Sequence, residues 1–97
     1  MLTEILTQNP GDAFARYGLA MEHANQGQTD ASLAEFDRLL STHPDYTAGY
    51  FMAAQTLVKA GRTEGAKARL AQGIASAQRT GNAHALGEMQ ALLEELG

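Results

Sequence analysis

The chain has 97 residues, 44% of them hydrophobic, which suits one small domain with a single modest core. Eleven acidic and seven basic residues give a formal net charge of −4, which repels phosphate backbones and anionic lipid and so argues against nucleic-acid and membrane partners. Cysteine is absent, which excludes disulfides, thiolate catalysis and thiolate metal sites.

The first predicted element is a half-helix over residues 1–8, in which Leu2 and Ile5 are apolar and after which Pro10 marks the end of a repeat. It lacks a basic start and an uninterrupted apolar run, so we expect no secretory leader, no membrane span and a cytoplasmic location. Helical spacing of apolar residues then predicts helices at about 12–26, 29–42, 45–60, 63–79 and 82–96.

Helix start and stop signals agree with these boundaries. A short side-chain oxygen that can accept a hydrogen bond from a first-turn N–H stands at the start of each helix: Asp12, Thr29, Asp45, Thr63 and Asn82. Three glycines that can end a helix in the left-handed conformation follow the first, third and fourth: Gly27, Gly61 and Gly81. Glycines within the predicted helices indicate close backbone approach to neighbouring helices: Gly18, Gly49, Gly65, Gly73 and Gly87.

The chain repeats itself with a period of 34 residues. This shift aligns Pro10 with Pro44 and residues 27–30 with residues 61–64. Stacked αα-hairpins require such a period, because each unit must repeat the surface that docks onto its neighbour. A plain antiparallel bundle would also hold five amphipathic helices with short loops, but it needs no period.

The two copies resemble the tetratricopeptide repeat (TPR), whose 34-residue pattern is W-x2-L-G-x2-Y…A-x3-F…P. The first copy reads Arg16-x2-Leu19-Ala20-x2-His23, Ser32-x3-Phe36, Pro44. The second reads Tyr50-x2-Ala53-Ala54-x2-Leu57, Ala66-x3-Leu70, with Gln78 in place of the proline. Residues 83–87 look like the opening of a third first helix, displaced by one residue.

This resemblance implies an all-α fold, a right-handed α-solenoid of two TPR helix hairpins plus a C-terminal capping helix. A single domain over residues 1–97 would comprise the half-helix of a truncated repeat at 1–8, a first repeat at 12–43, a second at 45–79 and the capping helix at 82–96. The helix at 63–79 fits the family pattern least well, because it lacks the terminal proline and contains Gly65 and Gly73.

No motif indicates catalysis, a metal or a cofactor. The histidines at 23, 43 and 84 lack a second histidine three to five residues away. The carboxylates at 88, 94 and 95 fit a solvated helix face, and the serines at 32, 41 and 76 lack a nucleophile-elbow context. We therefore expect no enzyme, no catalytic residue and no metal or cofactor; an enzyme whose site no motif reveals is the alternative.

Charge is unevenly distributed. Residues 1–58 contain seven acidic and two basic residues, whereas residues 59–79 contain five basic residues and one acidic residue. Arg62, Lys67 and Arg69 cluster on the helix predicted at 63–79 and its entry turn. This cluster can meet an acidic partner or the acidic half of a second copy, or it forms an ordinary solvated face.

The resemblance also implies a partner site, because first helices of TPR hairpins line the concave surface. It places these residues there: Phe14, Tyr17, Gly18, Met21, Asn25, Phe51, Met52, Gln55 and Lys59. Large apolar side chains there suit a partner protein's helix or extended peptide; packing between helices is the alternative for Tyr17 and Phe51.

Two further expectations concern partners. Chaperone-binding TPR proteins hold a peptide's carboxylates with a Lys, Asn and Arg clamp, but the corresponding positions here are Tyr17, Met21, Ala48 and Met52, so such a clamp is not expected. The alternative to peptide binding is a structural role in which the apolar groove drives self-association into a homodimer or larger homo-oligomer.

Overall fold

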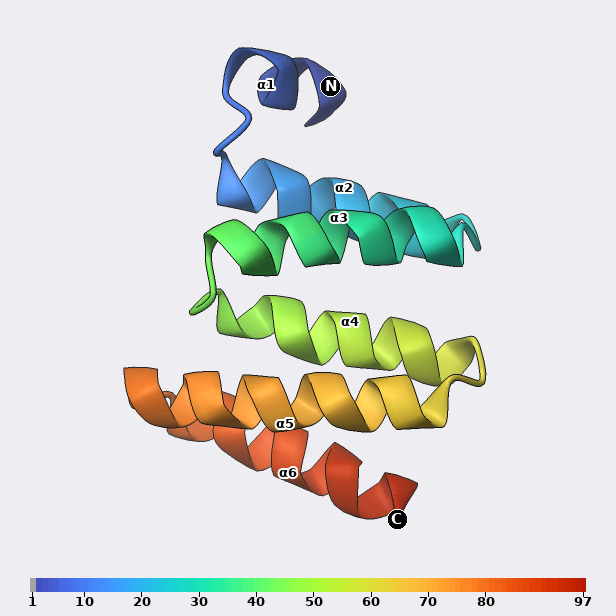
Figure 1. Ribbon diagram of the computed structural model, residues 1–97, viewed down its shortest axis with the longest axis vertical. Helices are drawn as coiled ribbons and strands as arrows, with labels where there is room; N and C mark the ends of the chain where they lie inside the picture. The colour runs from blue at the N-terminus through green and yellow to red at the C-terminus, as the bar shows by residue number, and fades with distance from the viewer. Residues whose placement is uncertain (1) are drawn as a thin grey trace.

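The computed structural model describes residues 2–97, so Met1 of the predicted first segment lies outside the described residues. Within this range every regular secondary-structure element is a helix (Figure 1). Its helices are α1 (Leu2–Gln8), α2 (Ala13–Asn25), α3 (Thr29–Thr42), α4 (Thr47–Lys59), α5 (Thr63–Thr80) and α6 (Ala83–Leu96).

The helices stack along the longest axis of a body that measures 40 × 30 × 17 Å. Hairpin α2–α3 lies above hairpin α4–α5, with α1 at one end and α6 at the other (Figure 1). Helix α4 contacts both α2 and α6, and α5 contacts α4 and α6. This arrangement confirms the predicted all-α solenoid of two helix hairpins with a helix at the C-terminal end.

The glycine turns form as predicted. Gly27, Gly61 and Gly81 have φ angles of 74°, 75° and 68°, in the left-handed region that a Cβ atom disfavours. The residue after each glycine donates its N–H back into the helix just ended, and Gln28 N reaches His23 O at 2.9 Å. This is the hydrogen bond of a Schellman motif, which satisfies a carbonyl left open at the helix end.

Two of the five predicted N-caps are confirmed. Asp12 Oδ1 accepts from Ala15 N at 2.9 Å, and Asn82 Oδ1 accepts from Ala85 N at 3.1 Å. Each bond satisfies one of the N–H groups that have no partner within the helix.

The other three predicted caps are wrong. Thr29 and Thr63 already lie within α3 and α5, whose cap positions are Gln28 and Arg62. The physical reason is that one residue serves both helices: Gln28 closes α2 through its N–H and accepts the first hydrogen bond of α3, from Ser32 N, through its carbonyl. Asp45 does not cap either, since α4 begins at Thr47 rather than at the predicted residue 45.

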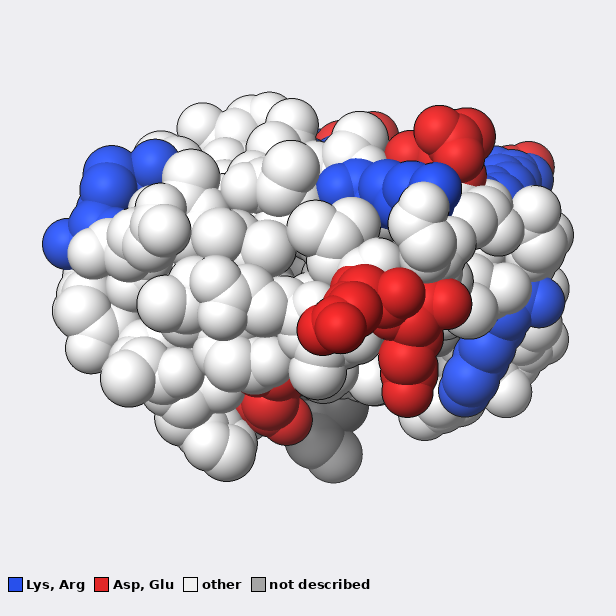
Figure 2. All heavy atoms as spheres, turned by 90° about the horizontal axis from the view of Figure 1, so that it is seen from below, with Lys and Arg blue, Asp and Glu red and all other residues white. Residues whose placement is uncertain are grey.

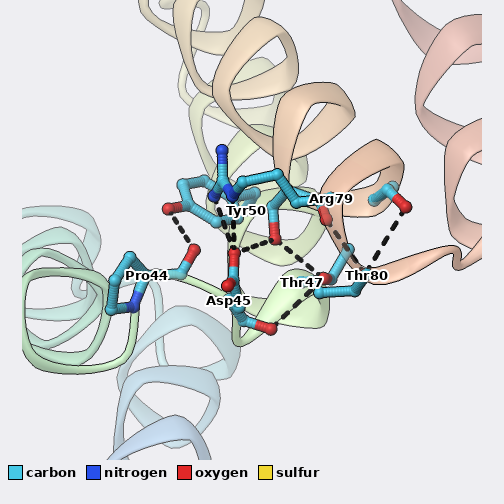
Figure 3. A network of polar contacts seen from close by, with 8 residues as sticks. Pro44, Asp45, Thr47, Tyr50, Arg79 and Thr80 are labelled. Carbon is cyan, nitrogen blue, oxygen red and sulfur yellow. Dashed lines mark hydrogen bonds and ion pairs between the residues drawn. The ribbon is translucent and has the colours of Figure 1, made fainter.

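A polar network explains the role of Asp45 (Figure 3). The Asp45 carboxylate accepts from Arg79 Nη2 at 2.7 Å and from Ser76 Oγ at 3.3 Å, both on α5. Ser76 and Thr47, both buried, share a hydrogen bond of 2.9 Å. The network ties the loop between the hairpins to the last turns of α5, where the repeat pattern lacked its proline.

Two apolar clusters form the core. The smaller lies between the hairpins and consists of Ala20, Phe36, Leu39 and Ala53. The larger is built mainly from α4 and α5 and is closed by fully buried Met89 of α6. In the described part of the chain, no helix is long and apolar enough to cross a membrane.

Close approach at the helix glycines is confirmed in part. A Cβ atom at Gly73 would lie 2.6 Å from Tyr50 Cβ and would also collide with the Met89 sulfur. One at Gly49 would lie 3.0 Å from Leu40 Cδ2. The interpretation is wrong for Gly87, where an added Cβ would meet nothing within 4 Å.

The basic helix is largely neutralised by acidic residues of the same chain. Arg62 pairs with Asp30 at 3.0 Å, and Arg69 pairs with Asp37, so two basic residues on or beside α5 reach back to α3. Lys67 lies 3.4 Å from Glu64. The charges of this cluster are thus paired within the chain and remain partly exposed to solvent.

Candidate functional site

The face formed by the first helices α2, α4 and α6 carries two adjoining hollows. The one we call the aromatic hollow has a volume of 250 Å³ and is lined by Tyr17, Ala48, Phe51, Met52, Asn82, His84, Ala85 and Glu88. The one we call the lysine hollow has a volume of 230 Å³, and its lining includes Met21, Ala24, Asn25, Met52, Gln55, Thr56 and Lys59. Because Met52 lines both, the hollows form one groove across the three helices.

Most of the residues predicted for the partner site lie in this groove: Tyr17, Met21, Asn25, Phe51, Met52, Gln55 and Lys59. Phe14 lies outside the lining of both hollows, with 74% of its surface exposed. Gly18 was placed wrongly, because a Cβ atom there would lie 3.2 Å from Leu2 Cδ1, so this glycine faces α1.

The aromatic side chains of the groove belong partly to the core and partly to the surface. The Tyr17 ring packs edge-on against buried Phe36, with 6.3 Å between ring centroids, and lies 5.5 Å from the Tyr46 ring. Phe51 packs against the larger core cluster while also lining the aromatic hollow. Packing between helices is therefore confirmed for both rings, and each also has an edge that lines the hollow.

The tyrosines of this face are neutral hydrogen-bonding groups. Burial, and to a smaller extent the neighbouring Tyr46, raises the pKa of Tyr17 above its ordinary value. Burial, and to a smaller extent Asp12, likewise raises the pKa of Tyr46. Both phenols thus keep their protons at neutral pH, so Tyr17, which lines the aromatic hollow, carries no charge there.

Sequence reasoning missed the contribution of α6. Asn82, His84 and Glu88 were interpreted as a helix cap, a first-turn residue and a solvated carboxylate, yet all three line the aromatic hollow. The sequence did contain a signal for this, because residues 83–87 resemble the opening of the first helix of a third repeat. Such a helix continues the row begun by α2 and α4, so its first turns border the same groove.

A second surface hollow, of 420 Å³, lies between α3 and α5 and is lined by Asp37, Tyr50, Arg69 and Arg79 among others. Its two arginines already pair with Asp37 and Asp45. Within residues 2–97, no three histidine or carboxylate residues are grouped so that they could hold a metal ion. The groove on the first helices is therefore the better candidate site.

A comparison with known protein families shows which family this chain belongs to. The family model of the tetratricopeptide repeat matches residues 23–93, well over half of the chain. The chain belongs to the tetratricopeptide-repeat family. TPR domains are generally protein–protein interaction modules and are typically not catalytic.

Relatives of this TPR chain are known in several bacteria. A TPR repeat-containing protein of Pseudomonas aeruginosa is 27% identical over 98% of this chain and 90% of its own. The crystal structure of a TPR domain protein from Salinibacter ruber is 34% identical over 88% of this chain and 94% of its own, with a TM-score of 0.79. The type III secretion translocator chaperone SycD of Yersinia enterocolitica shares the fold, with a TM-score of 0.87 over 98% of this chain and 66% of its own at 16% identity.

Proposed function

We propose that this TPR chain binds a peptide segment of a partner protein in the groove formed by the aromatic and lysine hollows. The observation that carries the proposal is the lining of this groove by Tyr17, Phe51, Met21 and Met52, large side chains that are only half-buried. Aromatic rings supply rigid contact area and methionines adapt to varied shapes, which suits a surface that binds another polypeptide.

Charge supports the first-helix face over the second-helix face. Arg62 and Arg69 are paired with acidic residues of the preceding repeat, and Arg79 is paired with Asp45, so a partner there would have to displace existing ion pairs. The net charge of −4 favours protein over nucleic acid or an anionic membrane as the partner.

The test replaces Met21 and Met52 by glutamine, which has similar length and helix propensity. Affinity capture from the native cell should then lose the partners that the wild type retains, since each apolar anchor typically contributes about 2 kcal/mol, or roughly 30-fold in Kd. Circular dichroism of the same preparation should remain helical, because both side chains are only partly buried.

The matched control places two glutamines at Ala68 and Ala71, which lie on α5, outside both hollows. This variant should retain every partner of the wild type. A Met21→Gln, Met52→Gln protein that stays folded and captures the same partners would move the binding surface away from the groove. One that unfolds would show that the two methionines serve the core instead.

A further inference from the structure

The groove has a charge pattern of its own. Among the described residues, Glu88 is the only carboxylate that lines the aromatic hollow, and Lys59 is the only charged residue that lines the lysine hollow. Figure 2, viewed from the α6 end, shows a group of acidic side chains on this end of the molecule, with basic side chains close beside it as well as at the margins. The two ends of the groove thus carry opposite charges.

Within the described residues, neither of these two charges has a fixed ion pair. Among residues 2–97, five of the seven lysines and arginines have a carboxylate within 4.0 Å, and the exceptions are Lys59 and Arg38. Glu88 lies 3.3 Å from His84 Nε2, a contact that is an ion pair only when the imidazole is protonated. The paired charges of α3 and α5 hold the repeats together, whereas Glu88 and Lys59 remain available.

The aromatic hollow suits a basic side chain. Tyr17, Phe51 and Met52 offer apolar surface for the methylene groups of a lysine or arginine, and aromatic rings also attract the cation itself. The Glu88 carboxylate, with its side chain 48% exposed, lies at the edge of this surface and can accept from an ammonium or guanidinium group.

The lysine hollow suits an acidic side chain. Asn25 and Gln55 supply amide donors beside the Lys59 ammonium. Lys59 follows Met52 by seven residues on α4, which places the two about 10 Å apart along the helix axis. That distance corresponds to about three residues of an extended peptide or about two turns of a helix.

We infer, on the basis of the proposed function, that the partner segment carries a basic residue, an apolar anchor and an acidic residue in spatial order along the groove. The basic side chain lies on Tyr17 and Phe51 and pairs with Glu88. The apolar anchor contacts Met52, and the acidic side chain pairs with Lys59. The electrostatic contacts fix which way the segment lies, because reversing it would bring like charges together at both ends.

The experiment selects binders from a phage-displayed library of random 12-residue peptides on the wild type and on a Glu88→Lys, Lys59→Glu variant. The net charge stays at −4, because Glu88→Lys changes it by +2 and Lys59→Glu changes it by −2. A matched control swaps Glu94 and Arg38, which line neither hollow. Circular dichroism verifies that all three proteins are folded.

Peptides selected on the wild type should place Lys or Arg on one side of an apolar anchor and Asp or Glu on the other. Their affinity, measured by fluorescence anisotropy, should fall about 10-fold or more on the Glu88→Lys, Lys59→Glu variant and stay unchanged on the control. Selection on the swapped variant should return the same pattern with the charges exchanged. Salt should weaken wild-type binding, because the pairs lie at a partly exposed rim.

Failure of this inference is distinguishable from failure of the proposed function. Peptides that lose binding to the Met21→Gln, Met52→Gln protein but show no charge order, or bind the swapped variant equally well, would overturn the inference and leave the groove as the binding site. Two outcomes would contradict the proposed function and the inference together. In the first, the selected peptides bind the Met21→Gln, Met52→Gln protein as tightly as the wild type. In the second, the selection enriches no peptide on the wild type.

Discussion

Gly73 lies where α5 is pressed against two neighbouring helices at once. The nearest atoms to a methyl group added at this position would belong to Tyr50 of α4 and Met89 of α6. The thioether of Met89 can move, but Tyr50 Cβ is fixed to the backbone, so α4 and α5 would have to separate. The absent side chain therefore sets the distance between α4 and α5.

We expect Gly73→Ala to lower the free energy of unfolding by about 1–3 kcal/mol, because overpacking outweighs the gain in helix propensity. Gly87→Ala is the matched control in α6, where an added methyl group meets nothing within 4 Å and should stabilise by about 0.5–1 kcal/mol. Urea unfolding of both variants measures the difference. Equal effects of the two substitutions would contradict the proposed role of Gly73.

Asp12 and Asp45 show what could be predicted from sequence at single residues. Asp12 caps the helix that follows it, as its position three residues before Ala15 N predicts. Asp45 has the same chemistry before α4, yet its carboxylate is used by Arg79, 34 residues later in the chain. Local spacing identifies a cap, but it does not show a competing partner that only the folding of the second hairpin brings close.

At the level of helices, the period of 34 residues was the decisive signal. It predicted which helices pair and in which order they stack, since a repeated docking surface has few alternatives. It predicted less about α6, which has no second helix of its own within the described residues. Its groove-facing residues belong to a displaced copy of the pattern, so Glu88 and His84 could not be matched to family positions.

Helix α6 covers the apolar surface of the second hairpin through fully buried Met89 and through Leu86, Leu93 and Leu96, which pack against the larger core cluster. Deleting residues 82–97 should expose that cluster and cause loss of cooperative thermal unfolding or aggregation. Calorimetry and light scattering measure the outcome. A truncated chain that melts cooperatively within a few degrees of the full chain would show that α6 is an appendage rather than a structural cap.

The whole molecule has two faces with different uses of charge. On the side of α3 and α5, Arg62 and Arg69 join successive repeats through Asp30 and Asp37, and Arg79 pairs with Asp45 within the second repeat. These pairs are partly exposed, so each contributes only about 0–1 kcal/mol, but together they fix the register of the two hairpins. The face of α2, α4 and α6 instead presents its rings, thioethers and unpaired charges to solvent.

Self-association through this open face is the remaining rival to peptide binding, and the solution mass separates the two. We expect a monomer of 10.3 kDa in sedimentation velocity at about 10–100 µM, because two copies with a net charge of −4 repel one another. Adding a peptide selected on the groove should raise the mass by one peptide. A stable species of twice the chain mass that the Met21→Gln, Met52→Gln substitutions dissociate would instead assign the groove to a homodimer. A dimer unaffected by these substitutions would place self-association on another surface and leave the groove free for a partner.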